Sequence, residues 1–262
     1  MRFIETTIKI LKKVNLKNPI AIEGLPGVGN VGRIAAGYLV SELKMEKFAE
    51  LYSPYLLPLV ILHDTAEVQM LRCDFYYYKN KGNDIIVITG DSQSVSPEGH
   101  YIICEKILEF VKKLGANQII TLGGYANPSP GEVPRVIGAV NKKALVKKYE
   151  KFGINFGNDH PVGTIVGASG LLAGMAEFYG MDAVVLMGET LGLPMIIDPK
   201  AADSMLKILK KMLNIDLNLS KLEKNIKEIE KQLNKTEFMH QRMIPKQPPK
   251  PASGDESDYY IG

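Results

Sequence analysis

Long apolar runs and cysteine are scarce in this chain of 262 residues. Its longest apolar stretches, such as 85–89 and 183–187, are far shorter than the ~20 residues of a membrane span, so no membrane partner is expected. The first residues reach the acidic Glu5 early and lack the apolar core of a secretory leader, which predicts a cytoplasmic protein. Cys73 and Cys104 have no cysteine or histidine at ligand spacing beside them, so we expect buried, unreactive thiols.

Histidine and excess basic charge are also scarce. The four histidines are scattered without a carboxylate at helical spacing, so no metal site is predicted. Residues 1–199 carry 20 basic and 20 acidic side chains, so they are neutral overall. The net charge of +3 arises from residues 200–262, which carry 12 basic and 9 acidic side chains. This balance excludes a basic core domain that coats nucleic acid. Apolar residues at 45% and charged residues at 23% indicate a folded globular protein.

Short apolar runs that end in glycine predict strands buried on both faces. These runs cover 19–24, 84–90, 118–124 and 181–188. Helical patterns lie between and after them, at 31–43, 97–114, 141–152, from 170 onward, and 198–214. The alternation predicts an α/β fold with a mostly parallel sheet between helices. We also expect an antiparallel strand or hairpin in 67–79 that is added to the sheet, and a long loop over 153–170 around a strand at 162–166.

The composition divides the chain into three parts. We predict an α/β domain over 1–216, an amphipathic helix over 217–240, and a flexible, proline-rich linker with a terminal peptide over 241–262. The amphipathic helix opens with an S-x-x-E capping box at 220–223. Its narrow apolar seam either packs on the α/β domain or binds another chain, and it consists of Leu219, Leu222, Ile226, Ile229 and Leu233.

The segment from Gly27 to Gly32 has the G-x-G-x-x-G pattern of dinucleotide-binding loops, and it lies between a predicted strand and helix. The acidic residue that would bind the ribose is missing, because Glu50 lies in a stretch with no clear strand before it. Asn30 stands where a P-loop would need its lysine. The pattern therefore favours tight packing of strand on helix, with a nucleotide-binding enzyme as the alternative.

Three polar side chains follow predicted strands and would lie along the carboxyl edge of the sheet, where ligands of such folds bind. They are Asp91, Tyr125 and Glu189. This crevice is predicted from topology alone. Ser169 does not form a nucleophile elbow, because Leu171 replaces the second glycine of G-x-S-x-G. We therefore predict no catalytic, cofactor-binding or metal-binding residue, and an enzyme that uses the glycine loop or this crevice stays the alternative.

The block from Glu23 to Gly32 resembles the opening signature of the archaeal proteasome-assembly-chaperone family. Later blocks are similar to that family in the same order, at 121–124, 167–172, and 188–190 with 198–202. The resemblance covers about residues 18–238. It implies an α/β sandwich similar to nucleoside phosphorylases but without their catalytic apparatus, which works without ATP to assemble the α-ring of the 20S proteasome. It also implies a homo-oligomer.

Members of the resembled family carry C-terminal hydrophobic-Tyr-any tails like those of proteasome activators, which insert between α subunits. Tyr259, Tyr260 and Ile261 match that triplet. The sequence departs from the pattern at Gly262, which moves the terminal carboxylate one residue beyond the triplet. The resemblance thus implies partner-binding residues in the tail, with proteasome α subunits or the α-ring as the partner.

Overall fold

The computed structural model describes residues 4–157, 162–192, 197–224 and 226. Residues 1–223 form one compact unit, and residues 224–262 belong to a second. The division into 1–216, 217–240 and 241–262 stays a prediction. Within the described ranges, no helix has both the length and the apolar character that crossing a bilayer requires.

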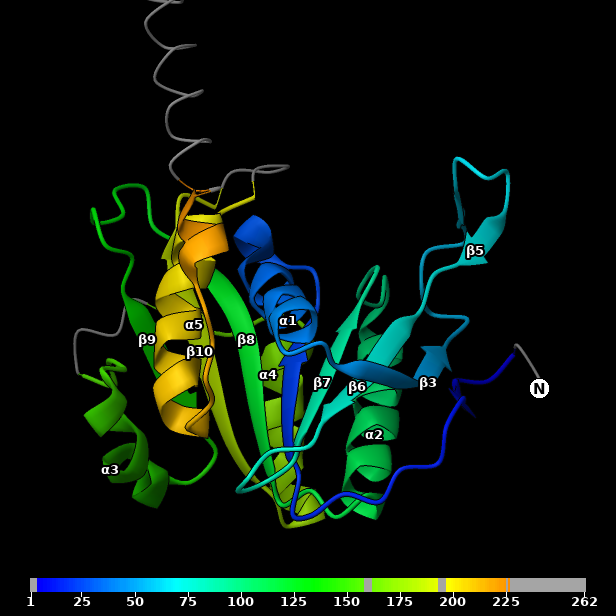
Figure 1. Ribbon diagram of the computed structural model, residues 1–262, viewed down its shortest axis with the longest axis horizontal. Coiled ribbons are helices and arrows are strands. Elements are labelled where there is room, and N and C mark those ends of the chain that lie inside the picture. The colour runs from blue at the N-terminus through cyan, green and yellow to red at the C-terminus, as the bar shows by residue number, and fades with distance from the viewer. Residues whose placement is uncertain (1–3, 158–161, 193–196, 225, 227–262) are drawn as a thin grey trace, which may run out of the picture. The chain divides into compact units, whose positions relative to one another are not determined.

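An eight-stranded mixed sheet forms the centre of the first unit (Figure 1), in the order β1-β3-β6-β7-β2-β8-β10-β9. Its four central strands are parallel, namely β7 (Ile85–Gly90), β2 (Ile20–Gly24), β8 (Gln118–Ala126) and β10 (Asp182–Thr190). The flanking strands are antiparallel, namely β9 (Val136–Val140) on one side and β6 (Cys73–Tyr78), β3 (Glu46–Tyr52) and β1 (Thr7–Ile10) on the other. The predicted α/β sheet between helices is confirmed, with antiparallel flanks added to it.

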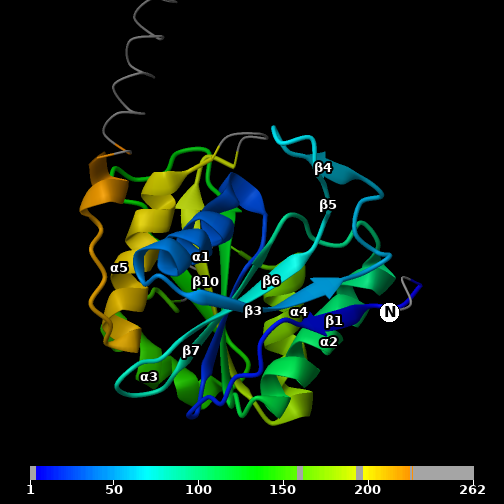
Figure 2. The ribbon, with the colours of Figure 1, turned by 45° about the vertical axis from the view of Figure 1, so that its right-hand side comes forward.

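Helices cover both faces of the parallel strands (Figures 1 and 2). The helices α1 (Val31–Glu42) and α5 (Pro199–Leu213) pack on one face, and α2 (Pro97–Lys113) and α4 (Ala168–Met175) pack on the other. Local capping explains where two of them begin. The side chains of Ser96 and Asp198 accept hydrogen bonds from the backbone N–H groups of Gly99 and Ala201, and a proline follows each cap.

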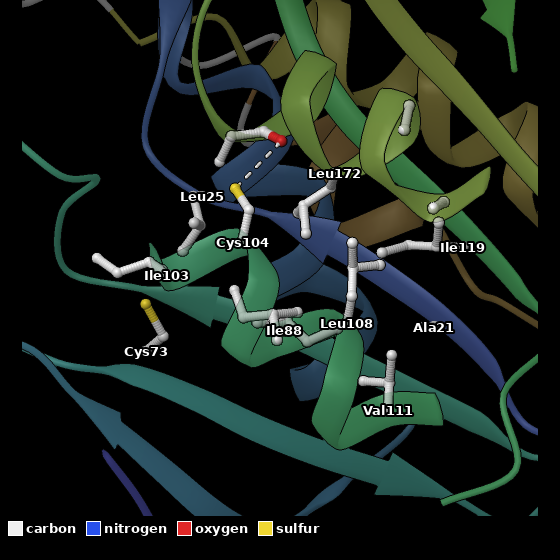
Figure 3. Close-up of a cluster of buried hydrophobic side chains, with 14 of the residues drawn as sticks. Ala21, Leu25, Cys73, Ile88, Ile103, Cys104, Leu108, Val111, Ile119 and Leu172 are labelled. Atoms are coloured by element: carbon white, nitrogen blue, oxygen red, sulfur yellow. Dashed lines mark hydrogen bonds between the residues drawn. The ribbon is translucent and has the colours of Figure 1, made fainter. Parts of the chain in front are cut away.

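The largest apolar cluster lies between the sheet and the pair α2 and α4 (Figure 3). Both cysteines are free and buried in it, as predicted. Burial raises the pKa of Cys73 to about 12 and also raises the pKa of Cys104. The Cys104 thiol donates to the Ala168 carbonyl oxygen at 3.9 Å. Neither thiol is poised to ionise near neutral pH, which agrees with a packing role.

Several local predictions were wrong. Glu50, which we placed in a stretch with no clear strand before it, lies within β3 (Glu46–Tyr52), and its buried carboxylate is balanced by ion pairs with lysine and arginine side chains. The predicted helix 141–152 is broken into η2 (Lys143–Leu145), α3 (Val146–Tyr149) and η3 (Glu150–Phe152). It starts late because the Asn141 side chain is hydrogen-bonded to the backbone of Met181 and Ala183.

The prediction of a strand within the loop 153–170 is also wrong. The described residues 162–166 form no strand, since Val162 and Ile165 pack as loop residues on the apolar cluster. The predicted antiparallel strand in 67–79 is confirmed by β6, which pairs with β3 and β7 in the main sheet. The first part of that segment, β5 (Val68–Met70), pairs instead with β4 (Val60–Leu62) in a separate hairpin. After α5, the side chain of Asn218, rather than Ser220, accepts the capping bond, from the Ser220 N–H at 3.0 Å.

Candidate functional site at the carboxyl edge of the sheet

Glycines at the end of β2, in the first turn of α1 and on β8 allow backbone segments to touch. A Cβ atom added to Gly32 would lie 2.2 Å from the Leu122 carbonyl oxygen on β8. A Cβ on Gly24 would lie 2.3 Å from the carbonyl oxygen of Gly32, and one on Gly124 would meet the Val28 carbonyl oxygen at 2.3 Å. Real side chains cannot approach backbone so closely. These glycines therefore bring β2, α1 and β8 into direct contact.

Gly29 lies in the middle of the loop and adopts the left-handed conformation, with φ of 60°. Its carbonyl oxygen accepts a hydrogen bond from the Asp198 N–H at 2.8 Å. A Cβ at Gly29 would approach the Thr190 hydroxyl oxygen at 2.8 Å. The loop is thus bonded to the start of α5 and packed on the end of β10, which supports the packing interpretation of the glycine pattern.

The acidic residue that we considered as a ribose ligand is also in the wrong place. Glu50 lies on β3, which is separated from β2 by β6 and β7. Its carboxylate lies 2.9 Å from Lys47 Nζ and 3.4 Å from Arg72 Nη1. Desolvation opposes ionisation, but the bonds from Lys47 and Tyr52 and the charge of Arg72 outweigh it and lower the pKa of Glu50. Glu50 therefore stabilises the antiparallel flank.

Glu189, at the end of β10, is buried with 1% exposure and is held by several donors. Its Oε1 atom accepts from Tyr125 Oη at 3.1 Å, and from Asn127 Nδ2 at 2.6 Å. Arg135 Nη2 donates to the same oxygen at 3.0 Å, and the Arg135 N–H donates to Oε2 at 3.2 Å. Burial alone would raise the pKa of Glu189, but these donors lower it to about 2. The carboxylate fastens the segment 127–135 to the sheet.

The structure brings together two of the three predicted edge residues. Tyr125 and Glu189 share a hydrogen bond across β8 and β10. Asp91 lies beyond β7 and accepts instead from the Arg72 N–H at 3.2 Å and from Gln69 Nε2 at 3.4 Å. The predicted crevice of three converging side chains is therefore not formed, because β2 lies between β7, which Asp91 follows, and β8, which carries Tyr125.

Gln93 connects the carboxyl-edge loops, and sequence reasoning missed it. Its Nε2 atom donates to the Pro26 carbonyl oxygen at 2.6 Å. Its Oε1 atom accepts from the Ala168 N–H at 2.9 Å and lies 3.2 Å from His100 Nε2. One amide thus joins the glycine loop, α2 and the start of α4. Its only signal in the sequence is its place three residues after Gly90, which ends a buried strand.

Sequence reasoning also missed the role of Glu23, which is a buried carboxyl group. It lies on β2 with 1% exposure, and its Oε1 atom accepts from the Leu25 N–H at 2.9 Å. Its Oε2 atom has no hydrogen-bond partner among the described residues. Desolvation raises the pKa of Glu23 to about 8, although bonds from backbone N–H groups lower it in part. Glu23 is thus a buried acid that keeps its proton near neutral pH.

Together these contacts indicate a scaffold whose edge groups bind one another. The Glu189 and Gln93 side chains both hydrogen-bond to loops at this edge, and the Glu23 side chain is buried in the interior. Among the described residues, no three side chains of histidine, cysteine, aspartate or glutamate gather as a metal site would require. The predicted partner-binding residues Tyr259, Tyr260 and Ile261 lie outside the described residues.

Comparisons with known proteins agree on one family. A family model described as PAC2 family matches residues 21–237. An uncharacterized protein of Methanocaldococcus jannaschii is 38% identical over 247 residues, which cover 94% of this chain and 93% of that one.

Two solved structures from Pyrococcus furiosus are also similar. PbaB, described as an archaeal proteasome activator, is 39% identical with a TM-score of 0.83, and the match covers 89% of this chain and 99% of that one. PbaA, described as an archaeal homolog of proteasome-assembly chaperone, is 30% identical with a TM-score of 0.74 and coverages of 90% and 93%.

Proposed function

The chain belongs to the PAC2 family, as its glycine-rich blocks predicted, and from this membership we propose that it is an ATP-independent proteasome chaperone or adaptor. In this proposal it acts in the cytoplasm as a homo-oligomer and binds the α subunits or the α-ring of the 20S proteasome. The observation that carries the proposal is its similarity, over nearly the whole chain, to an archaeal proteasome activator and to a homolog of proteasome-assembly chaperone.

The carboxyl edge of the sheet supports a binding role over an enzymatic one. Ligands of open α/β folds usually bind at this edge. Here the Glu189 carboxylate is occupied by Tyr125, Asn127 and Arg135, and the glycine loop is bonded to the start of α5. These groups stabilise a rigid body, which is what an assembly scaffold needs.

We propose the C-terminal triplet Tyr259-Tyr260-Ile261 as the docking element. Tyrosine offers a large apolar area with few rotatable bonds, which suits an anchor in a pocket. The acidic residues Asp255, Glu256 and Asp258 just before it would steer the tail toward a basic pocket. Because each copy of a homo-oligomer carries one tail, several weak contacts would add to a useful avidity.

Deleting residues 259–262 from the full chain tests the docking element. We expect co-purification with proteasome α subunits to be lost, while the oligomer mass and the melting temperature stay unchanged. The matched control replaces the acidic residues Asp255, Glu256 and Asp258 with the uncharged residues asparagine and serine. This variant keeps the triplet anchor and removes only the steering charge. Its association with α subunits should therefore become slower and less sensitive to salt.

Removal of Gly262 alone sharpens the test. It places the terminal carboxylate directly after Ile261, as in activator tails, so we expect tighter binding to α subunits. If the deletion of 259–262 leaves α-subunit binding unchanged, recognition lies on the folded unit and the proposed docking element is wrong. If the intact chain binds no α subunit at all, the proposed function itself is wrong.

A further inference from the structure

A dense run of lysines lies on η2, α3 and η3, the short helical turns that follow β9. Residues 142–151 contain five lysines and one acidic side chain, Glu150, and all six are exposed. Residues 1–199 as a whole carry equal numbers of basic and acidic side chains, so this run is a local excess of positive charge. The turns lie beside the ends at which β8 and β10 begin (Figure 1).

The spacing of these lysines does not stabilise the turns. Lys143, Lys147 and Lys151 follow one another at intervals of four residues, which places like charges side by side. Lysines often stand near the C-terminal end of a helix because they offset its dipole. These turns are only three or four residues long, so they have little dipole to offset. Helix stability therefore does not explain the row, and a bound anion would relieve its repulsion.

The fold neutralises only one lysine of the run. Lys142 Nζ lies 2.8 Å from Asp182 Oδ1. The other four form no ion pair with any acidic side chain among the described residues, and we call them the α3 lysines: Lys143, Lys147, Lys148 and Lys151. Glu150 likewise forms no ion pair within the described part of the chain. The positive charge of the α3 lysines is thus available to a partner.

Uncharged groups hold two of the α3 lysines in place. Lys148 Nζ donates to Gln118 Oε1 at 3.4 Å, and it lies 5.0 Å from the centre of the Tyr149 ring. Lys151 Nζ lies 5.2 Å from the centre of the Phe152 ring. An amide oxygen and two aromatic rings attract an ammonium group without cancelling its charge. Because these side chains are already positioned, they lose less conformational entropy when an anion binds.

A further lysine reaches the same surface from the end of α2. Lys112 Nζ donates to Asn117 Oδ1 at 2.9 Å. Asn117 directly precedes Gln118, and its carbonyl oxygen accepts from the Asp182 N–H at 2.9 Å. The contacts of α2, of the short turns and of β10 therefore meet at residues 117–118. Lysines from two separate parts of the chain form one basic surface at the amino ends of β8 and β10.

We propose that this basic surface binds an acidic segment of a partner protein, and that it does so separately from the C-terminal triplet. Each ammonium group is a compact charge with three donors, which suits the carboxylates of a flexible aspartate- or glutamate-rich segment. Charges of opposite sign across such a contact speed association and align the partner. The proposal adds a second interaction surface, on the folded unit, to the proposed function.

The same surface fits a nucleic acid less well. Residues 142–151 contain no arginine, which is the side chain that binds phosphate through two parallel hydrogen bonds. Single-stranded nucleic acids also need exposed aromatic rings on which the bases stack. Tyr149 is buried, and Phe152 is only partly exposed and carries the Lys151 ammonium group above its ring. The observed groups therefore favour carboxylates over stacked nucleotides.

A glutamate peptide tests the proposal on the full chain. Fluorescence anisotropy should detect binding of a labelled peptide of about ten glutamates at low salt, and the affinity should fall as salt screens the charges. Changing the four α3 lysines to glutamine should weaken binding by about tenfold or more, since each exposed charge contributes a few tenths of a kcal/mol. The variant Gln118→Leu keeps every charge but releases the Lys148 ammonium group, and it should weaken binding by about two- to fivefold.

The matched control changes four other exposed lysines to glutamine, namely Lys13, Lys44, Lys221 and Lys224. Both fourfold variants lower the net charge from +3 to −1, so general attraction changes equally, and only the control should keep the wild-type affinity. No binding by the wild type, or an equal loss in the control, would overturn the proposal. An unchanged affinity of Gln118→Leu would overturn a defined surface in favour of diffuse charge. If single-stranded DNA of the same charge binds more tightly than the peptide, the surface recognises phosphate and the proposal is wrong.

Discussion

Arg135 binds both oxygens of the Glu189 carboxylate, one through its side chain at 3.0 Å and the other through its backbone N–H at 3.2 Å. The two residues lie 54 positions apart in the sequence. The Arg135 side chain is half exposed, whereas Glu189 is buried. A single residue of the segment 127–135 thereby neutralises a carboxylate that would otherwise be costly to bury.

The Glu189 contact predicts a loss of stability in acid. The pKa of Glu189 is about 2 in the folded protein and 4.5 in the reference state, so its stabilisation is complete above about pH 5 and is lost as pH falls toward 2. A shift of this size corresponds to about 3 kcal/mol, which solvent screening at the half-exposed Arg135 reduces to about 1–2 kcal/mol. Glu189→Gln should lower the free energy of unfolding by that amount at pH 7, measured by urea denaturation. Equal stabilities of variant and wild type at pH 7 would contradict the prediction.

Glu23 predicts the opposite pH dependence. Its pKa is raised to about 8, so the folded state holds a proton that the unfolded state releases above about pH 4.5. Its contribution to stability therefore decreases as pH rises from about 5 to about 8, and the full shift corresponds to about 5 kcal/mol. Glu23→Gln removes this dependence. At pH 9 the variant should be more stable by about 2–4 kcal/mol, after the cost of a buried amide of about 1–3 kcal/mol.

Denaturation curves of the Glu23→Gln variant and the wild type at pH 5 and pH 9 measure this effect. The gap between the two proteins should widen with pH. A constant gap would mean that Glu23 is ionised in the folded protein, in contradiction to its burial and its unpartnered Oε2 atom.

Two glycines of α1, Gly32 and Gly37, provide a test variant and a matched control for the packing role of the glycine-rich segment. Gly32→Ala should destabilise the fold by several kcal/mol, because its Cβ would lie 2.2 Å from the Leu122 carbonyl oxygen and α1 would have to move from β8. Gly37 lies in the same helix with no atom near its added Cβ, so Gly37→Ala should stabilise the fold by about 0.5–1 kcal/mol. Thermal melts of both variants test this. A Gly32→Ala protein as stable as wild type would exclude the packing role.

A nucleotide-binding measurement distinguishes the proposed scaffold from the alternative, which is an enzyme that binds a nucleotide at the glycine loop. The glycine loop contacts the start of α5 and the end of β10, and Glu50 lies on a distant strand. Calorimetric titration of the full chain with ATP and with NAD should therefore find no dissociation constant below about 10 μM, roughly −7 kcal/mol. Tighter binding that is lost on Gly29→Val, in a protein that still folds, would favour the enzyme.

The parallel centre of the fold and the family could be predicted from the amino-acid sequence. Strands buried on both faces are continuous in apolar residues, and helix caps are local patterns, so β2, β7, β8, β10 and the starts of α2 and α5 were predictable. The glycine-rich blocks identified the family because close backbone contacts admit only glycine, as at Gly32. Such signals depend on a residue and its near neighbours in the chain.

The flanks of the sheet and the roles of its polar residues depend on tertiary contacts. The strand β3 is stable with Glu50 inside it because Lys47 and Arg72 lie beside that carboxylate, and Arg72 comes from the segment just before β6. Whether a carboxyl group is ionised depends on partners and burial: Glu189 accepts from the Arg135 and Asn127 side chains, whereas Glu23 is buried with only backbone N–H groups to offset its desolvation. The hairpin register, which turns Leu62 and Val68 outward, likewise depends on which face docks on the body. No local pattern encodes these relations, because they join residues that are distant in sequence.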